Sequence, residues 1–147
     1  MSNFFQKAAA FCAYQERCTS EIREKLYDWG VSSEESETII SKLIAEKYLN
    51  EERFAKIYAG SKFRTKKWGR LKIKYMLKQK GISNALISNG LKEINPEEYY
   101  EVLQTLALQK KESLKSKYDK AKVYQFLISK GFESDLVQEA IKELATY

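Results

Sequence analysis

Histidine is absent from the sequence, and cysteine occurs only twice, at Cys12 and Cys18. Two cysteines without any histidine cannot complete a four-ligand zinc site within one chain, and they cannot form a cysteine–histidine nucleophile. We therefore expect no metal site and no cofactor. Both cysteines are interpreted as ordinary buried or half-buried thiols.

Signals of catalysis are also scarce. The sequence has no glycine-rich phosphate loop and no histidine for proton transfer. Its paired carboxylates fall where the first turns of helices are expected, and the positive end of a helix dipole is a sufficient reason for negative charge there. These pairs are Glu34 and Glu35, Glu51 and Glu52, and Glu97 and Glu98. We expect a protein that is not an enzyme.

Proline occurs once and glycine six times, and no apolar run approaches the ~20 residues that span a bilayer. Residues 1–5 lack the charged and then apolar order of a signal peptide. We therefore expect a cytoplasmic protein without membrane contact. Hydrophobic residues make up 44% of the chain, and good helix formers recur throughout it, so the composition predicts a folded all-α protein.

The pattern Leu-x-x-x-Gly-apolar occurs three times, with the glycines 51 and 50 residues apart. Each copy also has a β-branched residue four positions before the leucine and an apolar pair 10 and 13 positions after the glycine. The copies contain Ile22, Leu26, Gly30, Val31, Ile40 and Leu43; Ile73, Leu77, Gly81, Ile82, Leu91 and Ile94; and Val123, Leu127, Gly131, Phe132, Ile141 and Leu144. Agreement at six positions in three copies indicates an internal repeat.

Each copy predicts two helices that meet at its glycine. Glycine adopts the left-handed conformation after a helix at little cost, so helices should end at Gly30, Gly81 and Gly131. Further helices are expected over residues 4–17, 51–64 and 97–114. The expected caps are Ser32 with Glu35, Asn50, Ser83, Asn95 before Pro96, and either Ser134 or Asp135.

These helices predict an all-α tandem array of three three-helix repeats. The expected modules are residues 1–49, 50–94 and 95–147. Neighbouring modules of such an array cover one another's apolar faces, so an elongated and curved molecule is expected.

Positive charge is concentrated in the middle of the chain. Residues 51–95 hold 12 basic and 3 acidic side chains, whereas residues 1–50 hold 6 and 8 and residues 96–147 hold 8 and 9. No carboxylate occurs from Lys62 to Lys80. A local excess of one sign suggests a surface that meets an anionic partner, with a merely solvated face as the alternative.

The basic stretch has a helical pattern. If residues 67–80 form one helix, four cations lie within about a quarter-turn of one another, beside an apolar stripe that faces the core. The cations are Lys67, Arg70, Lys74 and Lys78. A helix-turn-helix DNA reader is not expected, because residues 84–94 offer one lysine and no arginine for base recognition. Sequence-neutral phosphate contact stays open, with Trp68 and Tyr75 as candidate stacking groups.

A known family shares these motifs. Residues 48–55, Tyr-Leu-Asn-Glu-Glu-Arg-Phe-Ala, resemble the "YLDDxRFA" pattern of the RecX family, and residues 64–82 resemble its "R…KGxxxIxxEL…KGI" continuation. Residues 17–26 resemble the family's amino-terminal "R.YS..EL..KL" helix, and the last third fits by its repeat and length. Two departures stand out: Trp68-Gly69-Arg70 replaces the usual Lys-Gly-Pro, and Met76 replaces a common glutamate.

The resemblance implies tandem three-helix repeats that bind the RecA recombinase filament on single-stranded DNA and limit its growth, ATPase and strand exchange. The expected partner is this filament, bound by a monomer, and direct contact to the DNA phosphates stays open. The predicted docking residues are Arg64, Lys66, Lys67, Arg70, Lys74 and Lys78. Tyr48, Leu49, Phe54, Ile73 and Leu77 are expected to hold the central module together.

Two alternatives remain for the function. One is a sequence-neutral nucleic-acid-binding protein that acts without a recombinase. The other is a helical adaptor for an unrelated acidic protein.

Overall fold

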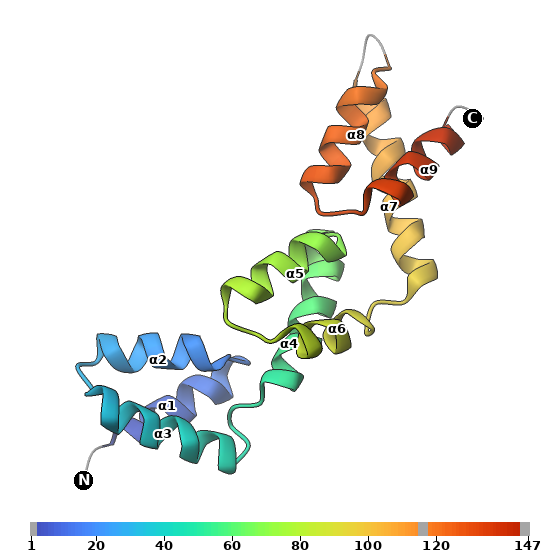
Figure 1. The fold of residues 1–147 in the computed structure, drawn as a ribbon. Coiled ribbons are helices and arrows are strands. Elements are labelled where there is room, and N and C mark those ends of the chain that lie inside the picture. The colour runs from blue at the N-terminus through green and yellow to red at the C-terminus, as the bar shows by residue number, and fades with distance from the viewer. Residues whose placement is uncertain (1–2, 115–117, 145–147) are drawn as a thin grey trace. The chain divides into compact units, whose positions relative to one another are not determined.

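A computed structural model describes residues 3–114 and 118–144. Both ranges consist of helices and short connections, and neither contains a strand. The helices are α1 (Phe4–Tyr14), α2 (Thr19–Asp28), α3 (Ser33–Ala45), α4 (Glu51–Ser61), the π-helical turn η1 (Lys62–Lys66), α5 (Arg70–Gln79), α6 (Asn84–Leu91), α7 (Pro96–Ser113), α8 (Lys120–Ser129) and α9 (Ser134–Leu144) (Figure 1). The predicted all-α fold of tandem three-helix modules is confirmed. The elongated, curved form and the module limits at 49/50 and 94/95 stay predictions.

The glycine of each repeat ends a helix as expected. Gly30, Gly81 and Gly131 have φ angles of 82°, 82° and 97°, in the left-handed region. The N–H of the next residue then donates to the carbonyl of the repeat's leucine, which closes the last turn of the helix. These bonds join Val31 to Leu26 at 3.0 Å, Ile82 to Leu77 at 3.1 Å and Phe132 to Leu127 at 3.2 Å.

Side-chain caps begin α3, α4, α6 and α7 at the predicted places. The bonds run from the N–H of Glu35 to Ser32 Oγ (3.2 Å), Arg53 to Asn50 Oδ1 (2.9 Å), Leu86 to Ser83 Oγ (3.4 Å) and Glu98 to Asn95 Oδ1 (2.9 Å). The expectation for α9 was wrong, because the helix already begins at Ser134. Ser134 and Asp135 therefore lie in its first turn. Glu133 precedes the helix, and its carboxylate pairs with Arg70 instead.

The cap at Asn50 permits a direct test. Replacing Asn50 by alanine leaves the N–H of Arg53 without this acceptor, so the free energy of unfolding should fall by about 1 kcal/mol. Asn89→Ala is the matched control, since Asn89 is exposed within α6 and alanine favours a helix interior. Urea denaturation followed by circular dichroism measures both. An equal effect of the two substitutions would show that Asn50 does not act as a cap.

The chain forms two compact units. The first extends through Tyr58 and includes Leu77–Gly90, and the second contains Ala59–Met76 and the chain from Leu91 onward. In the first unit, α1, α2 and α3 pack together around a core of Ala8, Ala9, Cys12, Ile22, Leu26, Val31, Ile39, Ile40, Leu43 and Leu49 (Figure 1). Cys12 and Cys18 are both buried and unbridged, as predicted, and burial raises the pKa of Cys12 to about 11.

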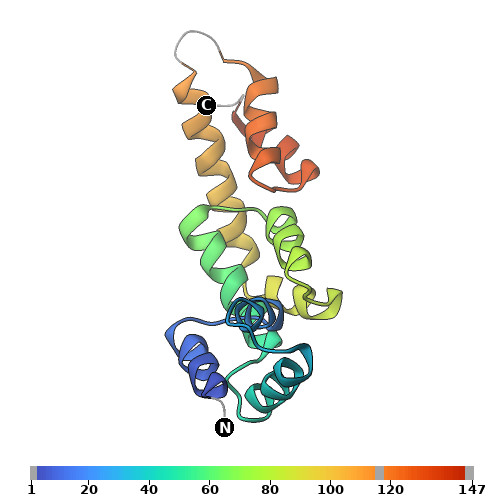
Figure 2. The same cartoon turned by 90° about the vertical axis from the view of Figure 1, so that its left-hand side faces the viewer.

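The second unit has an aromatic centre. The ring of buried Tyr99 lies 5.7 Å from that of Phe63 and 5.1 Å from that of Phe132, measured between centroids. The long helix α7 supplies Tyr99, and α8 and α9 pack against this helix (Figure 2). Among the helices of the two described ranges, none is long and apolar enough to cross a membrane.

Candidate functional site

The basic stretch does not form one helix. Helix α4 continues into the π-helical turn η1, and Lys67 ends this turn with a left-handed backbone, φ 57°. Its ammonium group donates to the carbonyl of Arg64 at 2.9 Å. Helix α5 begins only at Arg70. The prediction of a helix over residues 67–80 was therefore wrong at its start, and Lys67 lies outside the predicted helical face.

Arg70 is engaged within the molecule. Its guanidinium pairs with Glu133 at 2.9 Å and lies 4.0 Å from the centroid of the Tyr99 ring. Only 29% of its side chain is exposed. The position of Arg70 on an open cationic face was therefore predicted wrongly, because its partner Glu133 is 63 residues away in the sequence.

The remaining predicted cations are exposed. They are Arg64, Lys66 and Lys67 on the turn before α5, and Lys74 and Lys78 on α5 itself. In the two ranges that the structure describes, none of the five forms an ion pair. Their positive charge is thus not paired with any carboxylate of residues 3–114 and 118–144.

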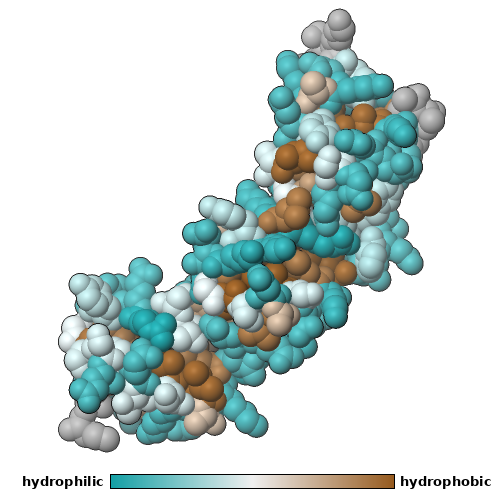
Figure 3. All heavy atoms as spheres, in the orientation of Figure 1, coloured by the Kyte–Doolittle hydropathy of each residue, from teal (hydrophilic) through white to brown (hydrophobic). Residues whose placement is uncertain are grey.

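Helix α5 also exposes two apolar side chains. Leu71 is 52% exposed and Tyr75 is 60% exposed. At ~100° per residue, these two residues share an arc of about 100° with Lys74 and Lys78. Figure 3 shows hydrophobic patches among the hydrophilic residues on the face that it draws. We name these four residues the α5 face; Leu71 was not predicted as part of it, although its spacing from Tyr75 could have indicated it.

The opposite side of α5 faces the core. Ile73 and Leu77 have no exposed surface, and Leu49 and Phe54 are 1% and 5% exposed, so these four core predictions are confirmed. The fifth was wrong: Tyr48 is 38% exposed, and its ring lies at 82° to that of Phe5, with the two centroids 6.1 Å apart.

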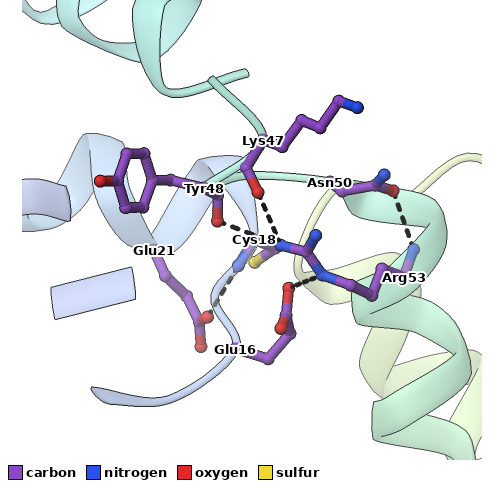
Figure 4. Close-up of polar contacts among 7 residues, drawn as sticks. All are labelled: Glu16, Cys18, Glu21, Lys47, Tyr48, Asn50 and Arg53. Atoms are coloured by element: carbon purple, nitrogen blue, oxygen red, sulfur yellow. Dashed lines mark hydrogen bonds and ion pairs between the residues drawn. The ribbon is translucent and has the colours of Figure 1, made fainter. Parts of the chain in front are cut away.

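The first two modules are connected by polar contacts that the sequence did not reveal (Figure 4). Arg53 pairs with Glu16 at 2.6 Å and donates to the carbonyls of Lys47 and Tyr48, each at 3.2 Å. Glu51 accepts from the N–H of Thr19 at 3.0 Å, at the start of α2. Glu51 was predicted to stabilise the first turn of its own helix, α4; its carboxylate also caps the start of α2.

The same connection includes Lys80. Its ammonium pairs with Glu21 at 3.0 Å, and its carbonyl accepts from Ser20 Oγ at 2.8 Å. Burial opposes the charged form of Glu21, but hydrogen bonds from Lys80 and from the N–H of Cys18 outweigh it and lower the pKa of Glu21. The start of α2 is thereby bound to the end of α5.

The second and third modules meet in a similar way, but through backbone groups. The N–H of Gly69 donates to the carbonyl of Lys130 at 2.7 Å, and that of Leu71 donates to the carbonyl of Gly131 at 2.9 Å. The start of α5 is thus bound to the end of α8. A Cβ atom added at Gly69 would lie 2.3 Å from the carbonyl of Gly131, so the two backbones touch without room for a side chain.

Arg70 belongs to this second contact. Its N–H donates to the hydroxyl of Tyr99 at 2.9 Å, and that hydroxyl donates to Glu133 at 2.5 Å. Burial and then the bond to Glu133 raise the pKa of Tyr99. Proline, usual at this position in the RecX pattern, has no N–H to give, so the departure to arginine adds a bond to Tyr99. Nothing in the structure explains the methionine at position 76.

Three sequence profiles of one family match the chain in order. The first, second and third three-helix domains of RecX match residues 5–43, 50–91 and 97–141. A protein named "Regulatory protein RecX" from Prosthecochloris aestuarii is 30% identical over 144 residues, which cover 95% of this chain and 92% of the relative. The chain belongs to the RecX family. Relatives of the same name from Clostridium tetani and Lactobacillus johnsonii are 32% and 35% identical over 93% and 68% of this chain.

Solved RecX structures have the same fold. The crystal structure of RecX from Lactobacillus salivarius superposes with a TM-score of 0.85 at 27% identity, covering 99% of this chain and 96% of that one. A second RecX crystal structure gives a TM-score of 0.83 at 29% identity. Several curated RecX relatives are longer: this chain spans 65% of the Clostridium tetani protein and 37% of the Lactobacillus johnsonii protein.

Proposed function

We propose that this RecX-family protein regulates the RecA recombinase without catalysing a reaction itself. It binds the filament of RecA on single-stranded DNA and limits filament growth, ATPase activity and strand exchange. Its relatives are named regulatory proteins, and three RecX domains match it in tandem. We further propose that it acts as a monomer in the cytoplasm, where no membrane contact is needed.

The observation that carries the proposal is the mixed character of the α5 face. Lys74 and Lys78 place two cations beside the exposed side chains of Leu71 and Tyr75. An exposed leucine makes no favourable contact with a phosphate group, whereas protein interfaces combine apolar contacts with complementary charge. A protein filament that contains a DNA polyanion offers both kinds of contact.

The cations of the preceding turn extend this surface. Arg64, Lys66 and Lys67 are exposed and have no carboxylate partner in the described parts of the chain. Like charges so close in sequence repel one another, and a partner of opposite charge relieves that repulsion. Arg70 contributes to the site indirectly, because its pair with Glu133 holds the start of α5 in place.

Binding to three targets separates this proposal from its alternatives. The protein is titrated against single-stranded DNA alone, RecA alone and the assembled filament, at one salt concentration. We expect the tightest binding to the filament. Equal affinity for DNA and filament would support a sequence-neutral nucleic-acid-binding protein, and no affinity for any of the three would favour an adaptor for another acidic protein.

A further inference from the structure

Two lysines lie over the ring of Trp68 in the second unit. The ammonium groups of Lys62 and Lys72 lie 5.3 Å and 4.8 Å from the centroid of the Trp68 ring. An aromatic face attracts cations, so the ring holds these two groups near each other despite their like charge. Lys130 is close enough to Lys72 and Lys66 for their positive charges to lower its pKa. We name Lys66, Lys72 and Lys130 the lysine cluster.

Three segments of the chain fix the cluster. The ammonium of Lys130, at the end of α8, donates to the carbonyl of Lys66 in η1 at 2.8 Å. The Cβ atom of Lys72, in α5, packs so closely on Gly131 that a Cβ added there would lie 2.3 Å from it. The backbones are held together by the hydrogen bonds from the N–H of Gly69 to the carbonyl of Lys130 and from the N–H of Leu71 to the carbonyl of Gly131. The backbones that carry the three lysines are therefore held by the same contact that connects the second and third modules.

The cluster lacks compensating negative charge. None of its three lysines takes part in an ion pair within residues 3–114 and 118–144. Glu133, which follows Gly131 by two residues, is engaged by Arg70 and Tyr99. Burial and then the charges of Lys72 and Lys66 lower the pKa of Lys130. The fold thus keeps three cations together at an electrostatic cost, which a bound anion would remove.

We propose that the lysine cluster is a phosphodiester-binding site that takes the backbone of single-stranded nucleic acid without reading its bases. Lysine ammonium groups contact phosphates as point charges and carry no sequence information. A strand brings one negative charge with each nucleotide, which suits several separate cations better than one small anion does. The site contains none of the four residues of the α5 face, shares Lys66 with the turn that extends that face, and draws Lys130 from the third module.

This site rests on the proposed function, because the RecA filament contains single-stranded DNA. Its test omits RecA, so that the site and the proposed function can be contradicted independently. The chain has two tryptophans, so Trp29→Phe leaves Trp68 as the only indole fluorophore. This protein is titrated with an oligothymidylate while Trp68 emission is followed. Because phosphate binding draws Lys72 off the ring, we expect emission to change to saturation and binding to weaken as salt rises.

Lysine-to-glutamine pairs in the Trp29→Phe protein locate the binding site. Lys72→Gln with Lys130→Gln should weaken binding at least about 10-fold and reduce the slope of log affinity against log salt by about 1.4, because each phosphate that is no longer neutralised lowers this slope by ~0.7. Lys120→Gln with Lys122→Gln, on exposed positions of α8, removes the same charge and should change affinity by less than about 2-fold. Lys66→Gln leaves its carbonyl bond to Lys130 intact and should weaken binding less than the first pair does.

The alternatives give different results. Equal weakening by the two lysine pairs would overturn the proposal, because diffuse charge would then explain the binding. Competition with inorganic pyrophosphate is the second test. If pyrophosphate displaces the oligonucleotide when both supply the same concentration of phosphate groups, the proposal is overturned, because the site would then bind a free anion as well as it binds a strand. If the protein binds the oligonucleotide as expected but binds the filament no more tightly than DNA alone, the phosphodiester site is supported and the proposed function is contradicted.

Discussion

Replacing Gly131 by alanine should destabilise the protein by about 2–5 kcal/mol, because alanine at this position suffers two penalties at once. The first is the left-handed backbone, φ 97°, which costs residues other than glycine about 1–2 kcal/mol. The second is steric, since the new Cβ would lie 2.3 Å from Lys72 Cβ and 2.6 Å from its backbone nitrogen. Guanidinium denaturation followed by circular dichroism measures the destabilisation.

Gly81 supplies the matched control. It ends α5 with φ 82°, and a Cβ added there would meet nothing within 4 Å. Gly81→Ala should therefore cost only the backbone penalty of about 1–2 kcal/mol. If Gly131→Ala and Gly81→Ala lowered the free energy of unfolding equally, the close contact between Gly131 and Lys72 would not contribute to holding the second and third modules together.

Much of the fold could be predicted because its signals are local. The ends of α2, α5 and α8 follow from glycines that tolerate a positive φ, and the starts of α3, α4, α6 and α7 follow from serine or asparagine caps. Helical spacing likewise predicted that Leu77 lies in the core. Helical periodicity alone could not show that Lys67 ends a π-helical turn, because that turn leaves no mark in the spacing of apolar residues.

The candidate site was harder to predict because its geometry depends on distant residues. Arg70 and Lys74 look equivalent in the sequence, yet Arg70 pairs with Glu133 whereas Lys74 is exposed. Lys130 was overlooked because it lies outside the basic stretch and reaches Lys66 only in the folded chain. Local patterns thus identified the basic region, and tertiary contacts decided which of its cations are available.

Reversing the charges of Lys74 and Lys78 to glutamate should weaken binding to the RecA filament at least about 100-fold, since like charges brought together at an interface cost several kcal/mol. The fold should remain intact, because both side chains are exposed on α5. Stability should change by less than about 1 kcal/mol, whereas Leu77→Ala in the core should cost about 2–5 kcal/mol. Co-sedimentation with the filament and circular dichroism measure the two effects separately.

Lys120→Glu with Lys122→Glu is the control for that reversal. The pair makes the same change of net charge on exposed positions of α8 and should leave filament binding within about 2-fold of the unchanged protein if the α5 face is the contact. A comparable weakening in this control would mean that net charge, and not the α5 face, determines the affinity.

The DNA-dependent ATPase of RecA tests the regulatory role most directly. The protein is added to filaments formed on single-stranded DNA, and the rate of ATP hydrolysis is followed at low and high salt. We predict that the unchanged protein lowers this rate at low salt and does so less as salt rises, because the exposed charges are screened within ~10 Å at 0.1 M. The folded protein with Lys74→Glu and Lys78→Glu should leave the rate unaffected. Equal suppression by both proteins would contradict the assignment of the α5 face, and a rate that the unchanged protein does not lower would contradict the proposed regulation of RecA.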